Sequence, residues 1–321
     1  MRYLVGYTAD ARGAEAIALA AALGGPTAHL DLAIVLPEAT PFSAVYPGGD
    51  HGYCSILADN VDAWAKDALA LVPEGIGARV IARAVSSPAR GLMALAAETG
   101  ARAIVLGGRK RHVAGFFAPG SVASALLHAS PIPVAMGSPE AVASMERANG
   151  KLGRVTALVG ARPGARAVVQ AAAAAAHHQG LPLRVVSLVA QDDLDPAPAD
   201  LEASIARIQA RVGEVVGELG VTAEVSIASG TDIDDAIAEL DWEDGEIAVV
   251  GSSRLARKRR IFLGSTAQRM LRTLPVPLVV VPKNYKTGPT LSGPDSPNDG
   301  AALPLFSKEQ APRRLAEGNE S

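Results

Sequence analysis

The 321-residue chain is 49% hydrophobic, 20% charged and 4% aromatic, and its formal net charge is −3. The length allows two domains that each bury a core, and the near-balanced charge excludes a general attraction to nucleic acid or to an anionic membrane. One cysteine excludes an intrachain disulfide, and no apolar run is long enough for a signal peptide or a membrane span, so we expect a cytoplasmic protein.

The first half of the chain alternates short apolar runs with alanine-rich or amphipathic segments. Apolar runs of this length indicate buried strands, and the segments between them indicate helices. We predict strands at 3–7, 30–36, 78–85, 103–106 and 134–136, and helices at 14–23, 56–72, 88–98 and 121–129. The stretch 36–55 is rich in proline and glycine and predicts a long loop.

The second half follows the same plan. We predict strands at 155–159, 183–189, 222–227, 247–250 and 278–281, and helices at 165–178, 199–218, 232–240 and 265–273. Strands that alternate with helices predict βαβ units and a parallel sheet covered on both faces. The expected fold class is α/β, with two tandem doubly wound domains, each a five-stranded parallel sheet flanked by helices in flavodoxin-like layering.

The domain boundaries follow from this plan. We predict a first domain at 1–138, a linker at 139–151 and a second domain at 152–282. The remainder, 283–321, is dominated by proline, glycine, serine, asparagine and charge, and too little of it is apolar to offset the entropy of ordering. We therefore predict a disordered tail, in which 303–306 is either a short docking segment or simply exposed.

An internal repeat supports the two-domain plan. The segment GGRKRHVAGFFAPGSVASALLHASPIPVAM (107–136) has a second copy, GSSRLARKRRIFLGSTAQRMLRTLPVPLVVV (251–281). Matching glycines, serines and prolines of the two copies keep a constant offset of 144 residues, as in Gly120 and Gly264. A glycine loop that leads into a helix start is typical of anion binding, because free backbone N–H groups and the helix dipole both favour negative charge.

Both copies resemble the C-terminal signature of the universal stress protein family, in which a spaced pair of glycines precedes Gly-Ser or Gly-Thr, a helix and a strand. The resemblance covers about 1–138 and 152–282 and implies a tandem member with an adenine nucleotide alpha hydrolase-like fold. It also implies ATP or AMP as a ligand, and we predict no metal. The candidate nucleotide-binding residues are Thr8, Val35, Gly107, Lys110, Gly120, Ser121, Gly251, Arg254, Gly264 and Ser265.

The chain departs from the family pattern twice in each half. The second glycine of the pattern is Lys110 in one half and Arg254 in the other, and the aspartate that ends the first strand is replaced by Thr8 and Gly160. A side chain at a positive-φ position costs about 1 kcal/mol or more, so we expect a changed loop. The two cations either pair with a phosphate or fill a pocket that no longer binds one.

Three functions stay open at this point. The leading hypothesis is a stress-response regulator that binds an adenine nucleotide weakly or in one half, with the first half favoured because it keeps Gly107, Gly108, Gly120 and Ser121. The alternative is an interaction module that has lost nucleotide binding and acts through protein partners. A slow ATPase has the least support, since no catalytic constellation can be argued from the spacing.

Other polar clusters have simpler explanations. The basic runs 109–112 and 257–260 either hold anions or are solvated loops. The aspartates of 231–246 suggest a metal site, but we favour a helix capped by Thr231 whose acidic first turn complements the dipole. His177 and His178 follow an alanine run, where we expect them to interact with a helix C-terminus.

The resemblance also predicts how the halves assemble. In this family the last strands of two domains often pair, and here both domains lie on one chain. We therefore predict an intrachain pseudo-dimer with Pro133–Met136 beside Pro277–Val281. A further homodimer stays open, and we expect neither nucleic acid nor membrane as a partner.

Overall fold

The fold is described from a computed structural model. The structure describes residues 1–37, 50–108, 120–137, 139–159, 165–190, 201–252, 261, 264–282, 285 and 303–308. Lys110 and Arg254, and with them both predicted basic loops, lie outside the described residues.

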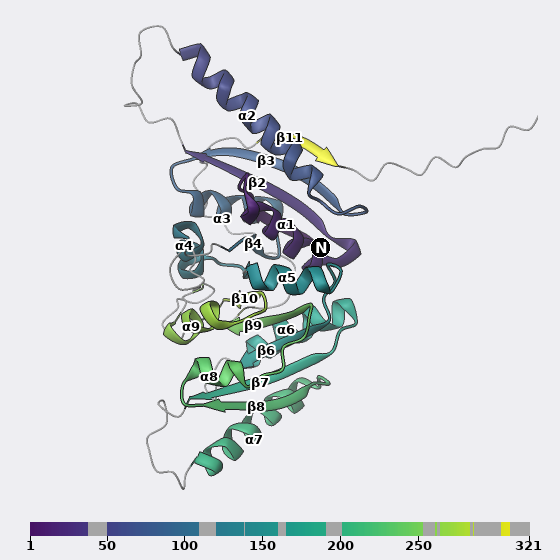
Figure 1. Cartoon of the computed structure of the whole chain (residues 1–321), viewed down its shortest axis with the longest axis vertical. Coiled ribbons are helices and arrows are strands. Elements are labelled where there is room, and N and C mark those ends of the chain that lie inside the picture. Colours follow the sequence, from purple (N-terminus) through teal and green to yellow (C-terminus); the bar gives the residue numbers. More distant parts are fainter. Residues whose placement is uncertain are drawn as a thin grey trace, which may run out of the picture.

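The described residues form a sheet of eleven strands in the order β11-β3-β2-β1-β4-β5-β10-β9-β6-β7-β8. Figure 1 shows this sheet running along the molecule, with α2 near one end and α7 near the other. Pairing is parallel within each half, and the strand order of the first half, 3-2-1-4-5, recurs in the second as 8-7-6-9-10. This topology confirms the predicted α/β class and its tandem doubly wound arrangement.

The elements of the first half are β1 (Arg2–Gly6), α1 (Ala11–Gly24), η1 (Gly25–Thr27), β2 (His29–Pro37), α2 (Asp50–Ala70), β3 (Gly77–Val85), α3 (Pro88–Thr99), β4 (Ile104–Leu106), α4 (Ser121–Ala129) and β5 (Val134–Met136). The linker contains α5 (Pro139–Arg147). The second half contains β6 (Arg154–Val159), α6 (Ala165–Gln179), β7 (Leu183–Ala190), α7 (Leu201–Leu219), β8 (Glu224–Gly230), α8 (Ile233–Ala238), β9 (Glu246–Gly251), α9 (Ser265–Thr273) and β10 (Leu278–Val281), and β11 (Leu303–Lys308) follows.

The two halves join where β5 pairs with β10 in antiparallel orientation. The register places Val279 opposite Ala135, with Leu278 opposite Met136 and Val280 opposite Val134. Ala135 and Val279 are equivalent positions of the internal repeat, so a local pseudo-two-fold axis passes between them. The pairing confirms the predicted proximity of the last strands of the two halves.

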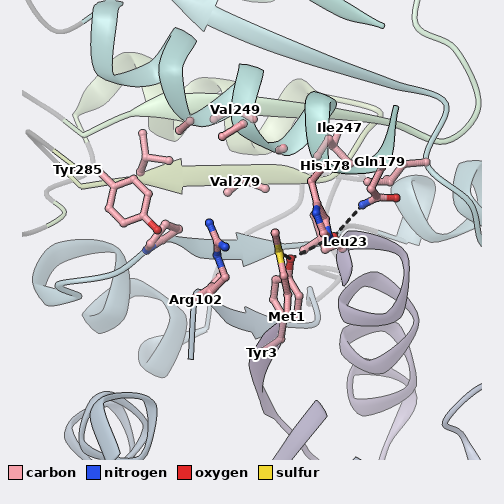
Figure 2. A pocket seen from close by; sticks show the side chains of 17 residues that line it. Met1, Tyr3, Leu23, Arg102, His178, Gln179, Ile247, Val249, Val279 and Tyr285 are labelled. Atoms are coloured by element: carbon pink, nitrogen blue, oxygen red, sulfur yellow. Dashed lines mark hydrogen bonds between the residues drawn. The ribbon is translucent and has the colours of Figure 1, made fainter. Parts of the chain in front are cut away.

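The two faces of the sheet are packed differently. On one face α3, α4, α8 and α9 cover a single core cluster that runs across both halves, with residues such as Leu92, Leu126, Ile237 and Leu271. The other face carries two clusters, one under α1 and α2 and one under α6 and α7. At the seam between these two clusters lies a pocket of about 100 Å³ (Figure 2).

Two local predictions need correction. Helix α2 begins at Asp50, so the end of the predicted loop is helical. The linker, for which the sequence analysis predicts no local structure, forms helix α5, with Ala141 and Met145 buried one turn apart on the same side. The tail is not unstructured throughout, since Leu303–Lys308 pairs with β3 as an antiparallel edge strand.

None of the helices within the described residues is long and apolar enough to cross a membrane.

Candidate functional site

The turn between β1 and α1 lies at the carboxyl edge of the sheet. Tyr7 still belongs to the sheet, since its N–H donates to the carbonyl oxygen of Ala33 at 3.0 Å. Thr8 follows and is exposed, and its hydroxyl donates to Oδ1 of Asp10 at 2.7 Å. Thr8, a predicted nucleotide contact, therefore binds the side chain of Asp10 two residues later.

Asp10 is the N-cap of α1. Its Oδ1 accepts from the N–H of Arg12 at 3.0 Å, and its Oδ2 accepts from Nε of Arg12 at 2.8 Å and from the terminal guanidinium nitrogen. Partial burial by itself would raise the pKa of Asp10, but the hydrogen bonds from Arg12 and Thr8 hold it below its ordinary value. Since its charge is already matched by Arg12, this carboxylate has little left to offer a ligand hydroxyl or cation.

Two glycines let α1 lie close to the ends of the first and fourth strands. A Cβ on Gly13 would come within 2.0 Å of the carbonyl oxygen of Thr8, and a Cβ on Gly107 within 2.0 Å of the carbonyl oxygen of Arg12. These neighbours are backbone atoms, which cannot rotate away as a side chain can. Gly107 is thus required for the packing of α1 against the end of β4, whether or not the loop holds a ligand.

The next residue of the loop already contacts an acid. The N–H of Gly108 donates to Oε2 of Glu15, on α1, at 3.1 Å. Burial raises the pKa of Glu15, and the hydrogen bond from Gly108 offsets part of that increase. The Glu15 carboxylate therefore accepts from a backbone N–H of the loop that the sequence analysis predicts to bind phosphate.

The start of α4, by contrast, carries no side-chain cap among the described residues. Gly120 is the N-cap with extended backbone angles, φ −67° and ψ 173°, and Ser121 behind it is exposed. A Cβ built on Gly120 would meet no described atom within 4 Å. A glycine N-cap offers the first-turn N–H groups no side-chain acceptor of its own, and a helix start of this kind favours an anion.

The second half has the same helix start but a different loop entry. Gly264 caps α9 with φ −77° and ψ 170°, nearly the values of Gly120, and Ser265 is its first helical residue. A Cβ on Gly251 would lie 2.8 Å from a methyl group of Val168, which is a side chain rather than backbone. The N–H of Ser252, the counterpart of Gly108, donates to the carbonyl oxygen of Val281 at 2.9 Å and stays in the sheet.

The structure brings some of the predicted nucleotide-binding residues close together and leaves others apart. Thr8 and Gly107 both pack against the first turn of α1. Val35 lies in β2, half-buried against the core on the α3 face. Sequence reasoning missed Arg12 and Glu15; the spacing of Asp10 before the helix signals a cap, but no local pattern signals the contact of Glu15 with Gly108, 93 residues away.

Two of the aspartates of 231–246 link α8 to α9. Asp232, rather than the predicted Thr231, is the N-cap of α8; its Oδ1 accepts from the N–H groups of Asp234 and Asp235 at 2.8 and 3.0 Å. Its Oδ2 pairs with Arg269 of α9 at 2.9 Å. Within the described part of the chain, no group of three potential metal ligands is placed to hold an ion.

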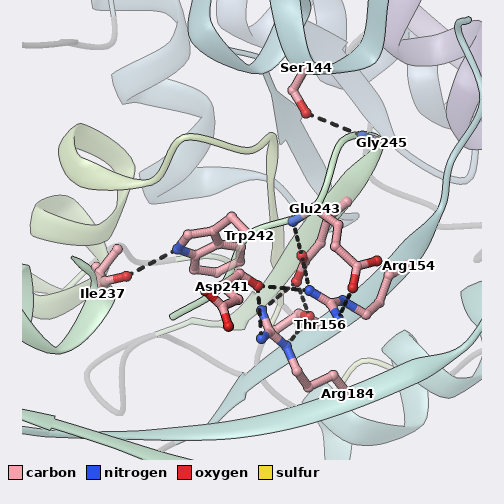
Figure 3. A network of polar contacts seen from close by, with 10 residues as sticks. Ser144, Arg154, Thr156, Arg184, Ile237, Asp241, Trp242, Glu243 and Gly245 are labelled. Atoms are coloured by element: carbon pink, nitrogen blue, oxygen red, sulfur yellow. Dashed lines mark hydrogen bonds and ion pairs between the residues drawn. The ribbon is translucent and has the colours of Figure 1, made fainter. Parts of the chain in front are cut away.

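A second polar cluster is buried in the second half (Figure 3). Glu246 is fully buried, and its two carboxylate oxygens pair with Arg184 and Arg154, each at 2.7 Å. Its remaining contacts are the hydroxyl of Thr156 and the N–H of Glu243. The guanidinium of Arg184 also lies 5.2 Å from the centre of the Trp242 ring. The acid is so fully paired that we assign the cluster a structural role.

Comparison with known proteins places these features in a family. The model described as the universal stress protein family matches residues 1–136 and again 152–282. Curated universal stress proteins of Mycobacterium tuberculosis and Mycobacterium bovis are each 30% identical over 232 residues, covering 68% of this chain and 77% of theirs.

Solved structures agree on the fold. The crystal structure of a universal stress protein from Archaeoglobus fulgidus aligns over 88% of this chain and 98% of its own, with a TM-score of 0.56 and 21% identity. A putative universal stress protein from Pseudomonas aeruginosa aligns over 88% of this chain and 92% of its own, with a TM-score of 0.53 and 19% identity.

Proposed function

The chain belongs to the universal stress protein family, and from this premise we propose that it is a stress-response regulator whose first half binds ATP or AMP weakly, at the loop that follows β4. Family membership supports the regulatory role. The observation that supports a nucleotide is the start of α4 at Gly120 and Ser121, which no side chain of the described residues caps and which follows the fourth strand of a doubly wound domain. The single cysteine of the sequence fits the cytoplasm as the place of action.

In this proposal the phosphates contact the first turn of α4. Backbone N–H groups and the helix dipole favour negative charge there, and the Ser121 hydroxyl adds a donor. The same geometry explains why binding is weak. Glu15 occupies the N–H of Gly108, and its carboxylate would repel a phosphate that approached the end of β4.

Calorimetric titration of the full chain with ATP and AMP tests the proposal. Gly120→Val would place a side chain where the anion sits and should abolish binding, while Ser121→Ala should weaken it by about 1 kcal/mol, the scale of one net hydrogen bond. Lys110→Gly restores the family pattern. It weakens binding by about 1–3 kcal/mol if the lysine contacts a phosphate, and strengthens binding if the lysine fills the pocket.

Glu15 provides the sharpest variant. Glu15→Gln keeps an acceptor for Gly108 but removes the charge, so nucleotide affinity should rise by about fivefold, the scale of one partly exposed charge interaction. Glu214→Gln, an exposed change on α7, is the matched control and should leave affinity unchanged. Affinity that does not rise in Glu15→Gln would contradict the proposed repulsion.

A second candidate function has its own support. The Glu15–Gly108 contact and the Arg12–Asp10 pair both satisfy groups that a nucleotide would use, which favours an interaction module that works without one. No binding of ATP or AMP by the wild type or by Glu15→Gln at millimolar ligand would reject the nucleotide proposal and leave this function.

A further inference from the structure

A pocket lies between the two halves, on the face opposite the core cluster that both halves share. Its floor is formed by alternate residues of the central strands. Val279 of β10 and Val249 of β9 point to this face, while their neighbours Val280 and Val250 point to the shared core. The period-2 alternation of strands therefore supplies an apolar floor to which both halves contribute.

The wall on the side of the second half is an alanine surface. Ala171, Ala174 and Ala175 of α6 are spaced three and four residues apart, so they lie on one side of the helix, and all three line the pocket. Their methyl groups are too short to fill the space between α6 and the end of α1. The pocket thus exists because the facing residues are small.

A hydrogen bond between the halves fixes the position of α6 against α1. The side-chain amide of Gln179 donates to the carbonyl oxygens of Leu23 and Ala22, at 2.8 and 3.2 Å, at the C-terminal end of α1. The hydroxyl of Tyr3 donates to the same Leu23 oxygen at 3.1 Å. These bonds satisfy the carbonyls at the end of α1 and hold the pocket at a defined width.

The charge of the pocket is positive. Arg102, just before β4, is exposed and reaches into the pocket between Tyr285 and Met1 (Figure 2). No ion pair among the described residues involves Arg102, and the described lining contains no aspartate or glutamate. Its field reaches across the pocket: burial raises the pKa of Tyr3 to about 12 and also raises that of Tyr285, and in both cases Arg102 offsets part of the increase.

We propose that this pocket binds a small monocarboxylate with an apolar body, whose carboxylate pairs with Arg102 and whose hydrocarbon part lies against Val249, Val279 and the alanines of α6. The apolar floor and wall select the hydrocarbon, and the Arg102 guanidinium, which has no ion-pair partner among the described residues, selects the anion. The volume sets the size: an apolar cavity of about 150 Å³ holds benzene, so this smaller pocket of about 100 Å³ suits a hydrocarbon body of about four to five carbons, as in hexanoate. The site is separate from the loop that follows β4, and the inference does not depend on nucleotide binding.

Titration of the full-length protein with hexanoate, followed by calorimetry, tests this proposal, with hexan-1-ol as the uncharged probe. We expect hexanoate to bind the wild type and to bind about tenfold or more weakly to Arg102→Gln, the scale of a charge-assisted hydrogen bond. The alcohol should bind both proteins equally and weakly. Arg211→Gln, which removes an exposed arginine of α7, is the matched control and should bind hexanoate like the wild type.

A filling variant locates the site. Ala175→Leu should abolish binding of both probes while leaving the far-ultraviolet circular dichroism spectrum unchanged, because the added side chain enters existing space. ATP should not compete with hexanoate. Failure of hexanoate to bind the wild type at millimolar concentration, or equal affinity of the wild type and Arg102→Gln, would overturn the proposal. Equal affinity of the wild type for hexanoate and hexan-1-ol would overturn it as well.

Discussion

The two halves share a strand order but bury opposite charges at matching places. Asp31 lies beside Leu4 in the register of β2 with β1, and Arg184 lies beside Thr156 in the equivalent register of β7 with β6. Asp31 is fully buried, yet its partners Arg2 and Arg79 are about one-third exposed. Arg184 and its partner Glu246 are both buried.

The same strand arrangement therefore accommodates two kinds of buried ion pair, one with partly exposed cations and one with both charges buried. In the first half the cations extend from a buried acid toward water, so losing the acid leaves them able to rehydrate. In the second half both signs are enclosed, and losing one partner leaves a charge without water or counter-charge. The second kind should therefore be far more sensitive to substitution.

The largest effect is expected from Glu246→Ala. Removal of this carboxylate leaves Arg184 buried and unpaired, and the free energy of unfolding should fall by about 3–5 kcal/mol. Urea denaturation measures the change. Glu243→Ala, which removes the exposed partner of Arg154, is the control and should cost less than about 1 kcal/mol. Equal losses in the two variants would show that the buried pair of Glu246 with Arg184 is no more sensitive to substitution than the exposed pair of Glu243 with Arg154.

Glycine substitutions compare the two loop entries. In Gly107→Ala the new methyl group meets the backbone of Arg12, which cannot move without shifting α1, so unfolding free energy should fall by about 1–3 kcal/mol. In Gly251→Ala it meets only a methyl group of Val168, and a loss of less than about 1 kcal/mol is expected. Thermal unfolding of both variants measures the difference, and a larger loss for Gly251→Ala would contradict the packing described for α1.

Asp31→Asn tests the ion pairs of the first half, in which a buried acid contacts partly exposed arginines. The asparagine keeps the shape and an acceptor, while Arg2 and Arg79 can turn to solvent, so we expect a loss of about 1–2 kcal/mol, the scale of hydrogen bonds to a charged group. Urea denaturation alongside Glu246→Ala gives the comparison. A loss as large as that of Glu246→Ala would show that the partial exposure of Arg2 and Arg79 does not reduce the cost of losing their buried counter-charge.

The smallest effect concerns the cap of α1 and its dependence on pH. Because hydrogen bonds hold the pKa of Asp10 below its ordinary value, its ionised form contributes stability above about pH 4, and this contribution is lost as the pH falls through the folded pKa. Asp10→Ala should cost about 1 kcal/mol at neutral pH. Melting temperatures of wild type and variant should converge in acid. Asp62→Ala, at an exposed position of α2, should show no such convergence.

The sequence predicts most of the strands and helices because their apolar periodicity is strong. The predicted ranges for α4, α9, β5 and β10 agree with the structure to the residue, and the constant offset of the repeat led to the pairing of β5 with β10. Local patterns are sufficient here because each of these elements is short and is bounded by Gly-Ser or Pro-x-Pro.

The features that sequence reasoning missed depend on tertiary contacts. In the sequence Glu15 looks like any other helix residue, and its contact with Gly108 arises only because α1 packs against the end of β4. Arg184 and Glu246 lie in strands whose periodicity does not reveal that their partners are buried with them. Strand β11 contains Pro304 within a polar tail, and its pairing with β3 could not be anticipated from composition.

The axis between Ala135 and Val279 has a consequence for how this protein tolerates change. In an assembly of two identical chains, the residue on such an axis must fit its own copy, and every substitution there occurs twice. Here one fused chain places an alanine opposite a valine, so the small residue makes room for the larger one. A substitution at this junction alters one side alone, and each half is free to acquire a surface or a pocket that the other lacks.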